Sequence, residues 1–195
     1  RGGPGLGTIQ PSQADYFQST RGGGHGDYYN FVLAPGSVQE AADLIYEAFD
    51  LADKYRVPAM LLADGLIGQM MEAVELPPKR DLATLPEKDW AVGNQYKTHR
   101  ERRIVTSLDL DPLVLEQWNV DRFKVYDEIK EKEARAEEVN TEKAELIFVA
   151  YGTAARVCKG AIRLAKEEGL EIGLVRPITL WPYPEKVIQK YAEQG

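Results

Sequence analysis

Few residues in this chain have types and spacing that could do chemistry, and the most suggestive lie near its beginning. Arg1 could hold a carboxylate through two parallel hydrogen bonds, because the guanidinium group is planar and carries its donors as a fork. His25 and Asp27 are separated by one glycine, and a neighbouring carboxylate can orient a histidine that titrates near neutral pH. A polar glycine-rich turn would explain the same segment, 24–27, without any chemistry. The residue types alone therefore leave a substrate site, a catalytic or metal role and a structural turn open.

Three other motifs could bind a ligand, and each has a simpler structural explanation. The glycine-rich segment 3–7 lacks the spacing of a dinucleotide fingerprint and the Lys-Ser or Lys-Thr of a P-loop, so a tight turn explains it. Asp64 with Asn94 is loosely similar to the magnesium motif of thiamine-diphosphate enzymes, but Ala63 replaces the leading glycine and the spacing is long, which favours a strand-end turn. Cys158 lies on an apolar helical face, which favours a buried thiol. We therefore expect no metal site and no catalytic residue in this chain.

The composition excludes several kinds of partner and site. The chain has 195 residues, of which 44% are hydrophobic and 28% charged, and its formal net charge is -7. This acidic balance repels nucleic acid, and the apolar runs fall far short of the roughly 20 residues that span a bilayer. One cysteine and two histidines cannot build a four-ligand zinc site, an iron–sulfur cluster or a disulfide framework from this chain alone. We therefore expect a cytoplasmic protein without nucleic-acid or membrane partners.

The first part of the chain predicts a strand, a long helix and a second strand. Residues 30–34 and 59–63 are short apolar runs typical of buried strands. Between them, Ser37 and Glu40 form a capping box that predicts a helix start, and Pro58 marks the helix end. A strand, helix and strand in this order favour a right-handed βαβ unit with parallel strands. A short helix is expected within 12–20.

The last part of the chain repeats this pattern. Residues 146–151 predict a strand, Thr153 could cap the following helix, and Gly169 is placed to end it. A further strand is expected at 170–175, and Pro184 could open a terminal helix.

The middle of the chain is rich in charge and proline. Residues 76–103 indicate a linker. Residues 121–145 predict an exposed helix, docked along one edge through Phe123, Tyr126 and Ile129 and carrying Glu128–Lys132 and Glu131–Arg135 pairs. The predicted architecture is therefore two separate α/β units joined by a charged connector.

Several ordered motifs make the chain similar to a known family. They are Arg-Gly-Gly-Pro-Gly at 1–5, Ser-Gln-Ala-Asp-Tyr-Phe-Gln at 12–18, Gly-His-Gly-Asp at 24–27, Ser-Val-Gln-Glu at 37–40, Ala-Asp-Gly at 63–65, Gly-Gln-Met-Met-Glu at 68–72 and Arg-Pro-Ile-Thr-Leu-Trp-Pro at 176–182. Together they resemble the alpha subunit of 2-oxoacid:ferredoxin oxidoreductases, and within that family the branched-chain, 2-oxoisovalerate type. The resemblance runs from end to end.

The resemblance implies a fold and a division into domains. Residues 1–76 would be the later part of a thiamine-diphosphate pyrimidine-binding domain with a parallel sheet. Residues 77–143 would be a charged linker with an exposed helix, and 144–195 the start of a transketolase C-terminal-like α/β domain, incomplete here. Because the chain begins without methionine and stops after a helical pattern, we expect an internal piece of a longer polypeptide.

The resemblance also implies a reaction. It is the oxidative decarboxylation of a 2-oxoacid to an acyl-CoA, with ferredoxin as the electron acceptor. Thiamine diphosphate and Mg²⁺ would be held with a companion subunit, and iron–sulfur clusters and CoA would belong to the full complex with beta, gamma and delta-type subunits. We expect this chain alone to bind none of these cofactors and to be inactive.

By the same resemblance, Arg1 matches the arginine that faces the substrate carboxylate, and His25 and Asp27 match a loop that lines the active-site side. The family's activating glutamate and its Tyr-Pro-Ile-Thr-Pro segment do not occur in this sequence. The alternatives are a non-catalytic α/β module that joins subunits, a 2-oxoglutarate or pyruvate type of the same superfamily, and another thiamine enzyme of the transketolase or dehydrogenase type.

Overall fold

The computed structural model describes residues 2–4, 7, 12–92 and 102–193. The chain divides into two compact units. The larger comprises residues 1–77 and 125–195, and the smaller comprises residues 78–124. The larger unit contains two three-stranded sheets, in the orders β2-β1-β6 and β3-β5-β4. No described helix meets the length and apolarity needed to cross a membrane.

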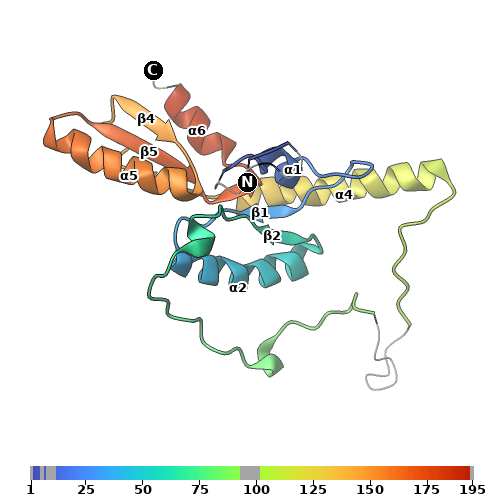
Figure 1. The fold of residues 1–195 in the computed structure, drawn as a ribbon. Helices are drawn as coiled ribbons and strands as arrows, with labels where there is room; N and C mark the ends of the chain where they lie inside the picture. Colours follow the sequence, from blue (N-terminus) through green and yellow to red (C-terminus); the bar gives the residue numbers. More distant parts are fainter. Residues whose placement is uncertain (1, 5–6, 8–11, 93–101, 194–195) are drawn as a thin grey trace. The chain divides into compact units, whose positions relative to one another are not determined.

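The first sheet contains the predicted βαβ unit. β1 (Phe31–Leu33) and β2 (Ala59–Leu61) are parallel neighbours, and α2 (Val38–Tyr55) connects them along one face (Figure 1). The Ser37 hydroxyl accepts a hydrogen bond from the Glu40 amide at 3.0 Å, as the capping box predicts. Helix α2 ends at Arg56, which adopts a left-handed conformation with φ 54°. The sequence pattern therefore predicted this unit correctly.

The third strand of this sheet comes from the other end of the chain. β6 (Thr179–Trp181) pairs antiparallel with β1 and brings Trp181 into the core. Trp181 stacks on Tyr29, with ring centroids 5.0 Å apart and an interplanar angle of 6°. It also meets Phe31 and Tyr126 edge to face. Residues near both chain ends therefore share one aromatic core, and both sheets lie in the larger compact unit.

The second sheet also differs from the prediction. β4 (Leu146–Val149) and β5 (Ile172–Pro177) are parallel and flank α5 (Gly152–Glu167) in sequence, as expected. β3 (Ala136–Val139), however, pairs antiparallel with β5 inside the segment predicted to be helical. Glu137 and Glu138 made this segment look like an exposed helix in the sequence. In the fold each of them pairs with a basic side chain that is distant in sequence, so the strand can form.

Helix α4 (Pro112–Glu133) therefore begins and ends earlier than the charge pattern indicated. Of the predicted docking edge, Tyr126 and Ile129 are buried, whereas Phe123 is 36% exposed. The predicted Glu128–Lys132 pair forms at 2.7 Å. The predicted Glu131–Arg135 pair does not form. Glu131 instead binds Lys186, and Arg135 binds Glu47, because the chain leaves the helix between them.

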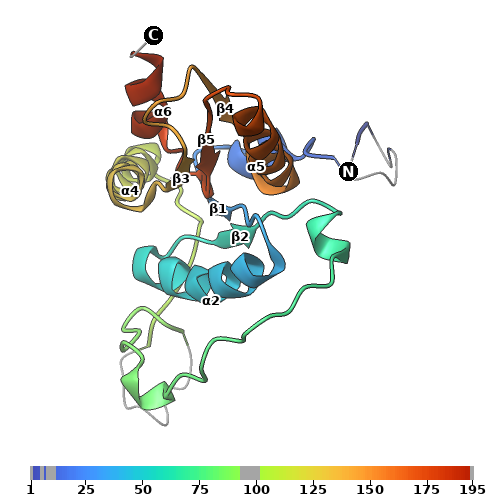
Figure 2. The same ribbon diagram turned by 90° about the vertical axis from the view of Figure 1, so that its left-hand side faces the viewer.

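The remaining elements are short. α1 (Tyr16–Thr20) precedes β1, η1 (Ile67–Gln69) follows β2, and α6 (Glu185–Ala192) ends the larger unit with Pro184 at its N-cap. Figure 2, turned by 90° from Figure 1, shows α4 end-on. Within residues 78–124, the described elements are η2 (Leu82–Thr84) and the N-terminal half of α4.

Candidate functional site

The structure describes two of the three residues predicted to belong to a substrate site, His25 and Asp27. Arg1 lies outside the described residues. His25 and Asp27 are exposed in the turn between α1 and β1, where Gly24, Gly26 and Asp27 all have positive φ. The Gly23 amide donates to the Tyr28 hydroxyl at 2.8 Å and closes this turn. The turn presents His25 and Asp27 outward, and neither lines a described cavity of the unit.

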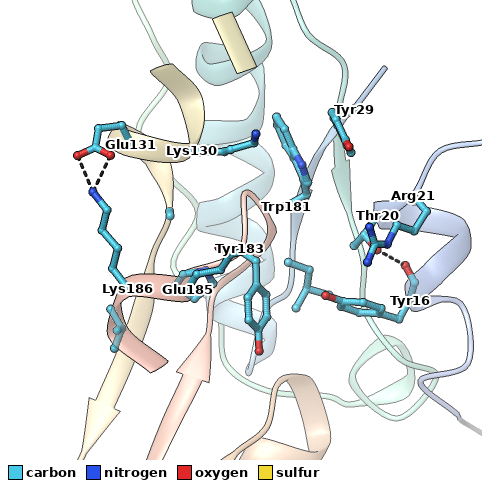
Figure 3. Close-up of a pocket in the computed structure, with 14 residues that line it drawn as sticks. Tyr16, Thr20, Arg21, Tyr29, Lys130, Glu131, Trp181, Tyr183, Glu185 and Lys186 are labelled. Carbon is cyan, nitrogen blue, oxygen red and sulfur yellow. Dashed lines mark hydrogen bonds and ion pairs between the residues drawn. The ribbon is translucent and has the colours of Figure 1, made fainter. Parts of the chain in front are cut away.

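A cleft of about 620 Å³ lies at the base of that turn. Arg21 and Tyr29, which precede and follow the turn, lie on the same side of the cleft (Figure 3). The opposite wall comes from the C-terminal half of α4 and the start of α6. The described lining residues are Tyr16, Thr20, Arg21, Tyr29, Lys130, Glu131, Ala134, Leu180, Trp181, Tyr183, Pro184, Glu185, Lys186 and Val187.

The cleft is aromatic inside and ion-paired at its rim. Lys186 donates to both oxygens of Glu131 at 2.6 Å, and Lys130 pairs with Asp127 at 2.9 Å. Burial raises the pKa of the Tyr183 hydroxyl, so this phenol stays protonated at neutral pH. The lining described here includes no cysteine and no histidine. It can pack against a flat or apolar group.

Two of the family-like motifs, 12–18 and 63–65, meet at a second place, the N-terminus of α5. The Thr153 hydroxyl donates to Asp64 Oδ1 at 2.7 Å, and the Thr153 amide donates to Asp64 Oδ2 at 3.0 Å. The side-chain amide of Gln13 donates through Nε2 to the Tyr151 carbonyl at 2.9 Å. We call these residues, Gln13, Asp64, Tyr151, Gly152 and Thr153, the Asp64 junction; it borders a cavity of about 50 Å³.

Asp64 caps the N-terminus of α5, although it is 89 residues away from Thr153 in sequence. Thr153 was predicted to cap this helix, but it lies within the first turn and donates to Asp64 instead. Asp64 also accepts the amides of Leu66 and Ile67 at 3.1 and 3.2 Å, which confirms the predicted strand-end turn. A carboxylate at a helix N-terminus is favoured by the helix dipole. Burial acts to raise the pKa of Asp64, but these hydrogen bonds outweigh it and lower the pKa.

Gly152 is required by the Asp64 junction. It has φ +57°, and a Cβ atom there would lie 3.1 Å from both Asp64 Oδ2 and Gln13 Nε2. We expect Gly152→Ala to lower the free energy of unfolding by about 1–3 kcal/mol, because it adds backbone strain and displaces the carboxylate. Chemical denaturation of the full chain measures this change.

Gly160 is the matched control on the same helix. A Cβ atom at Gly160 would meet nothing within 4 Å, so Gly160→Ala should be neutral or stabilise the fold by up to about 1 kcal/mol. Equal losses for the two variants would show that crowding at the Asp64 junction is not the cause.

A buried ion network provides a second connection between the two sheets. The side chain of Arg176 on β5 is 7% exposed. It donates to both oxygens of Glu40 on α2, at 3.0 and 2.7 Å, and to Glu137 on β3 at 2.6 Å. Nearby, Arg156 donates to the Gly36 carbonyl and to Glu72. Sequence reasoning did not identify these partners, since they are brought together only by the fold.

The described residues do not fit the metal and diphosphate end of thiamine diphosphate, which the resemblance implies. Both oxygens of Asp64 are already engaged by four donors of this chain. Among the residues that the structure describes, no group of three His, Cys, Asp or Glu side chains could hold a metal ion. Asn94, the other half of the loosely matched motif, lies outside the described residues. No step of a reaction is therefore assigned to a metal held by this chain.

Cys158 is half-buried on α5 and packs against the small apolar cluster of Ala155, Ile162 and Leu174. This agrees with a structural thiol on the apolar face of the helix.

Comparisons with known proteins find the same family that the sequence motifs resemble. Residues 1–147 match the family model described as pyruvate flavodoxin/ferredoxin oxidoreductase, thiamine diphosphate-binding. Residues 144–195 match the model of pyruvate:ferredoxin oxidoreductase core domain II.

Similar individual proteins include enzyme subunits from archaea. A ketoisovalerate oxidoreductase subunit VorB of Methanothermobacter marburgensis is 48% identical over all of this chain and 54% of its own length. A 2-oxoglutarate synthase subunit KorA of Archaeoglobus fulgidus is 32% identical over all of this chain and 56% of its own length. The chain thus spans about half the length of the curated relatives it matches.

Among solved structures, a 2-oxoglutarate:ferredoxin oxidoreductase from Magnetococcus marinus matches with a TM-score of 0.77 and 22% identity. The match covers 99% of this chain and 38% of that chain, and it supports the α/β fold. Because the first family model covers well over half of the residues, the chain belongs to the pyruvate flavodoxin/ferredoxin oxidoreductase family, and residues 1–147 match its thiamine-diphosphate-binding domain.

Proposed function

We propose that this chain is part of an enzyme that oxidatively decarboxylates a branched-chain 2-oxoacid, 2-oxoisovalerate, to an acyl-CoA and passes the electrons to ferredoxin. The supporting observation is the difference in identity among relatives. Two ketoisovalerate oxidoreductase subunits are 48% and 46% identical to the whole chain. Two 2-oxoglutarate synthase subunits are 32% and 36% identical.

The proposed enzyme is a cytoplasmic complex. This chain is its alpha-type part, and beta, gamma and delta-type subunits and ferredoxin are its partners. Thiamine diphosphate, held with Mg²⁺ mainly by a companion subunit, would supply the carbanion chemistry of decarboxylation. Iron–sulfur clusters and CoA would belong to the rest of the complex. The exposed turn with His25 and Asp27 would line the active site from this side, which is consistent with its outward position on the larger unit.

Reconstitution with omissions tests this function. The complete complex should form acyl-CoA from 2-oxoisovalerate and reduce ferredoxin, and the activity should disappear when this polypeptide, the companion subunit, CoA or thiamine diphosphate is left out. Full activity of a complex assembled without this polypeptide would contradict the proposal.

Arg1 is the proposed carboxylate-binding residue. In the complete enzyme, Arg1→Ala should lower kcat/KM for the 2-oxoacid by about 10- to 100-fold, the cost of a lost charge-assisted hydrogen bond. Arg1→Lys should give a smaller loss, because it keeps the charge but not the fork of donors. Steady-state kinetics measure both. Unchanged KM and kcat in Arg1→Ala would refute this role.

A further inference from the structure

The turn that carries His25 and Asp27 has an unusual backbone. Gly22, Gly24, Gly26 and Asp27 all have positive φ, between 58° and 83°, a region that glycine adopts without strain and other residues rarely enter. Residues 23–27 are exposed, and a Cβ atom at Gly24 or Gly26 would meet nothing within 4 Å. Close packing of the turn's own residues therefore does not fix its conformation.

The side chain of Tyr28 contacts the turn at two places. The Tyr28 hydroxyl accepts a hydrogen bond from the Gly23 amide at 2.8 Å, and within the turn the Gly26 amide donates to the Gly23 carbonyl at 3.3 Å. The Tyr28 ring lies against Gly22, where a Cβ atom would be 3.2 Å from Tyr28 Cζ. The first two glycines of the turn are thus held by one half-buried tyrosine.

Tyr28 is connected to the rigid aromatic core of the larger unit. The next residue, Tyr29, stacks on Trp181 at 5.0 Å and meets Tyr126 edge to face at 5.4 Å (Figure 3). Phe31, two residues further on, is fully buried. A hydroxyl that reaches back from such a segment to a glycine-rich turn reduces the conformations open to that turn. The turn then loses less entropy when a ligand binds against it.

We propose that Tyr28 is a positioning residue, which holds the turn in the conformation that presents His25 and Asp27 to the active site. This inference rests on the proposed function, because it requires the turn to line the active site. Tyr28 acts through the turn and need not touch the substrate. Since a displacement of about 1 Å can cost about 100-fold in rate, one exposed hydrogen bond matters more for the reaction than for the stability of the fold.

Tyr28→Phe tests the proposal in the complete enzyme. The variant keeps the ring against Gly22 and removes the acceptor for the Gly23 amide. We expect kcat/KM for the 2-oxoacid to fall by about 3- to 10-fold, the equivalent of one hydrogen bond. The denaturation midpoint should stay at the wild-type value, because water replaces an exposed hydrogen bond.

Tyr191→Phe is the matched control. It also removes a tyrosine hydroxyl, which in the wild type bonds Thr141 at 2.8 Å, where α6 meets the segment after β3. This variant should lower the denaturation midpoint and leave kcat/KM unchanged, the opposite of what is expected for Tyr28→Phe.

A double-mutant cycle distinguishes positioning from a general structural effect. His25→Ala combined with Asp27→Ala should itself lower kcat/KM, and Tyr28→Phe should cause no further loss in that background, because the side chains that it positions are gone. Full activity of Tyr28→Phe, full activity of the double alanine variant, or the same loss from Tyr28→Phe in both backgrounds would overturn the proposal.

NMR relaxation of the full chain supplies a readout that does not require activity. The amides of residues 23–26 should become more mobile on the picosecond-to-nanosecond timescale in Tyr28→Phe and not in Tyr191→Phe. Unchanged mobility of the turn in Tyr28→Phe would also overturn the proposal. A complex that oxidises a different 2-oxoacid would contradict the proposed substrate alone, since the cycle is then measured with that substrate.

Discussion

Replacing Arg176 by methionine is expected to lower the free energy of unfolding by about 3 kcal/mol. The substitution keeps the volume of the side chain but leaves Glu40 and Glu137 without the guanidinium that holds both of them. Breaking a buried ion pair by removing one partner costs about 3–5 kcal/mol. We expect the lower end of that range, because Glu40 and Glu137 remain 24% and 34% exposed and are partly solvated.

Chemical denaturation of the full chain measures this loss, and Arg176→Lys is the control. Lysine keeps the charge but cannot bond two carboxylates through a fork, so it should retain roughly half of the stabilisation. If Arg176→Met stayed within about 0.5 kcal/mol of the wild type, as neutral surface substitutions do, the ion network would contribute nothing to holding the two sheets together.

Replacing Asp64 by alanine is expected to lower the free energy of unfolding by about 2–3 kcal/mol. The carboxylate accepts four hydrogen bonds, two from Thr153 and two from the amides that follow it. Hydrogen bonds to a charged group contribute about 1.5–3 kcal/mol each when buried. The total is expected to stay well below their sum, because the hydrogen bond from the Leu66 amide is exposed and water can replace the carboxylate there.

Hydrogen exchange locates the effect. The amide of Thr153 should exchange faster in Asp64→Ala, while the amides of β1 and α2 stay protected. Uniformly faster exchange across the whole unit would contradict a local role for the Asp64 junction.

The Asp64 junction should also respond to acid. Because the pKa of Asp64 is lower in the folded chain than in the unfolded chain, folding favours the ionised form. Its stabilisation is complete above the unfolded pKa of about 3.9 and is lost as the pH falls through the folded pKa. The difference in unfolding free energy between the wild type and Asp64→Asn should therefore be constant near neutrality and shrink below about pH 4.

Local sequence patterns predicted the local structure well. Ser37 and Glu40 mark the start of α2, and Gly169 follows the end of α5 with φ +80°, as expected for a helix terminator. These features depend on hydrogen bonds between residues a few positions apart. Parallel β1 and β2 followed from the strand, helix and strand order.

Long-range pairing was not predictable in the same way. β6 was missed because its three residues follow directly after β5, yet it pairs with β1 at the other end of the chain. β3 was missed because Glu137 and Glu138 resemble a solvated helix until their partners Lys159, Arg176 and Lys190 are known. Likewise, Asp64 was recognised as part of a turn, but its role as a cap for α5 depends on a contact 89 residues away in sequence.

Substrate choice by the complete enzyme tests the central functional claim most directly. The measurement is kcat/KM for ferredoxin reduction with 2-oxoisovalerate, 2-oxoglutarate and pyruvate, each with CoA and the full set of subunits. The proposed function predicts the highest value for 2-oxoisovalerate, by about tenfold or more, which corresponds to the 1–3 kcal/mol that an apolar pocket gains from extra methyl groups. An equal or higher value for 2-oxoglutarate or pyruvate would contradict it.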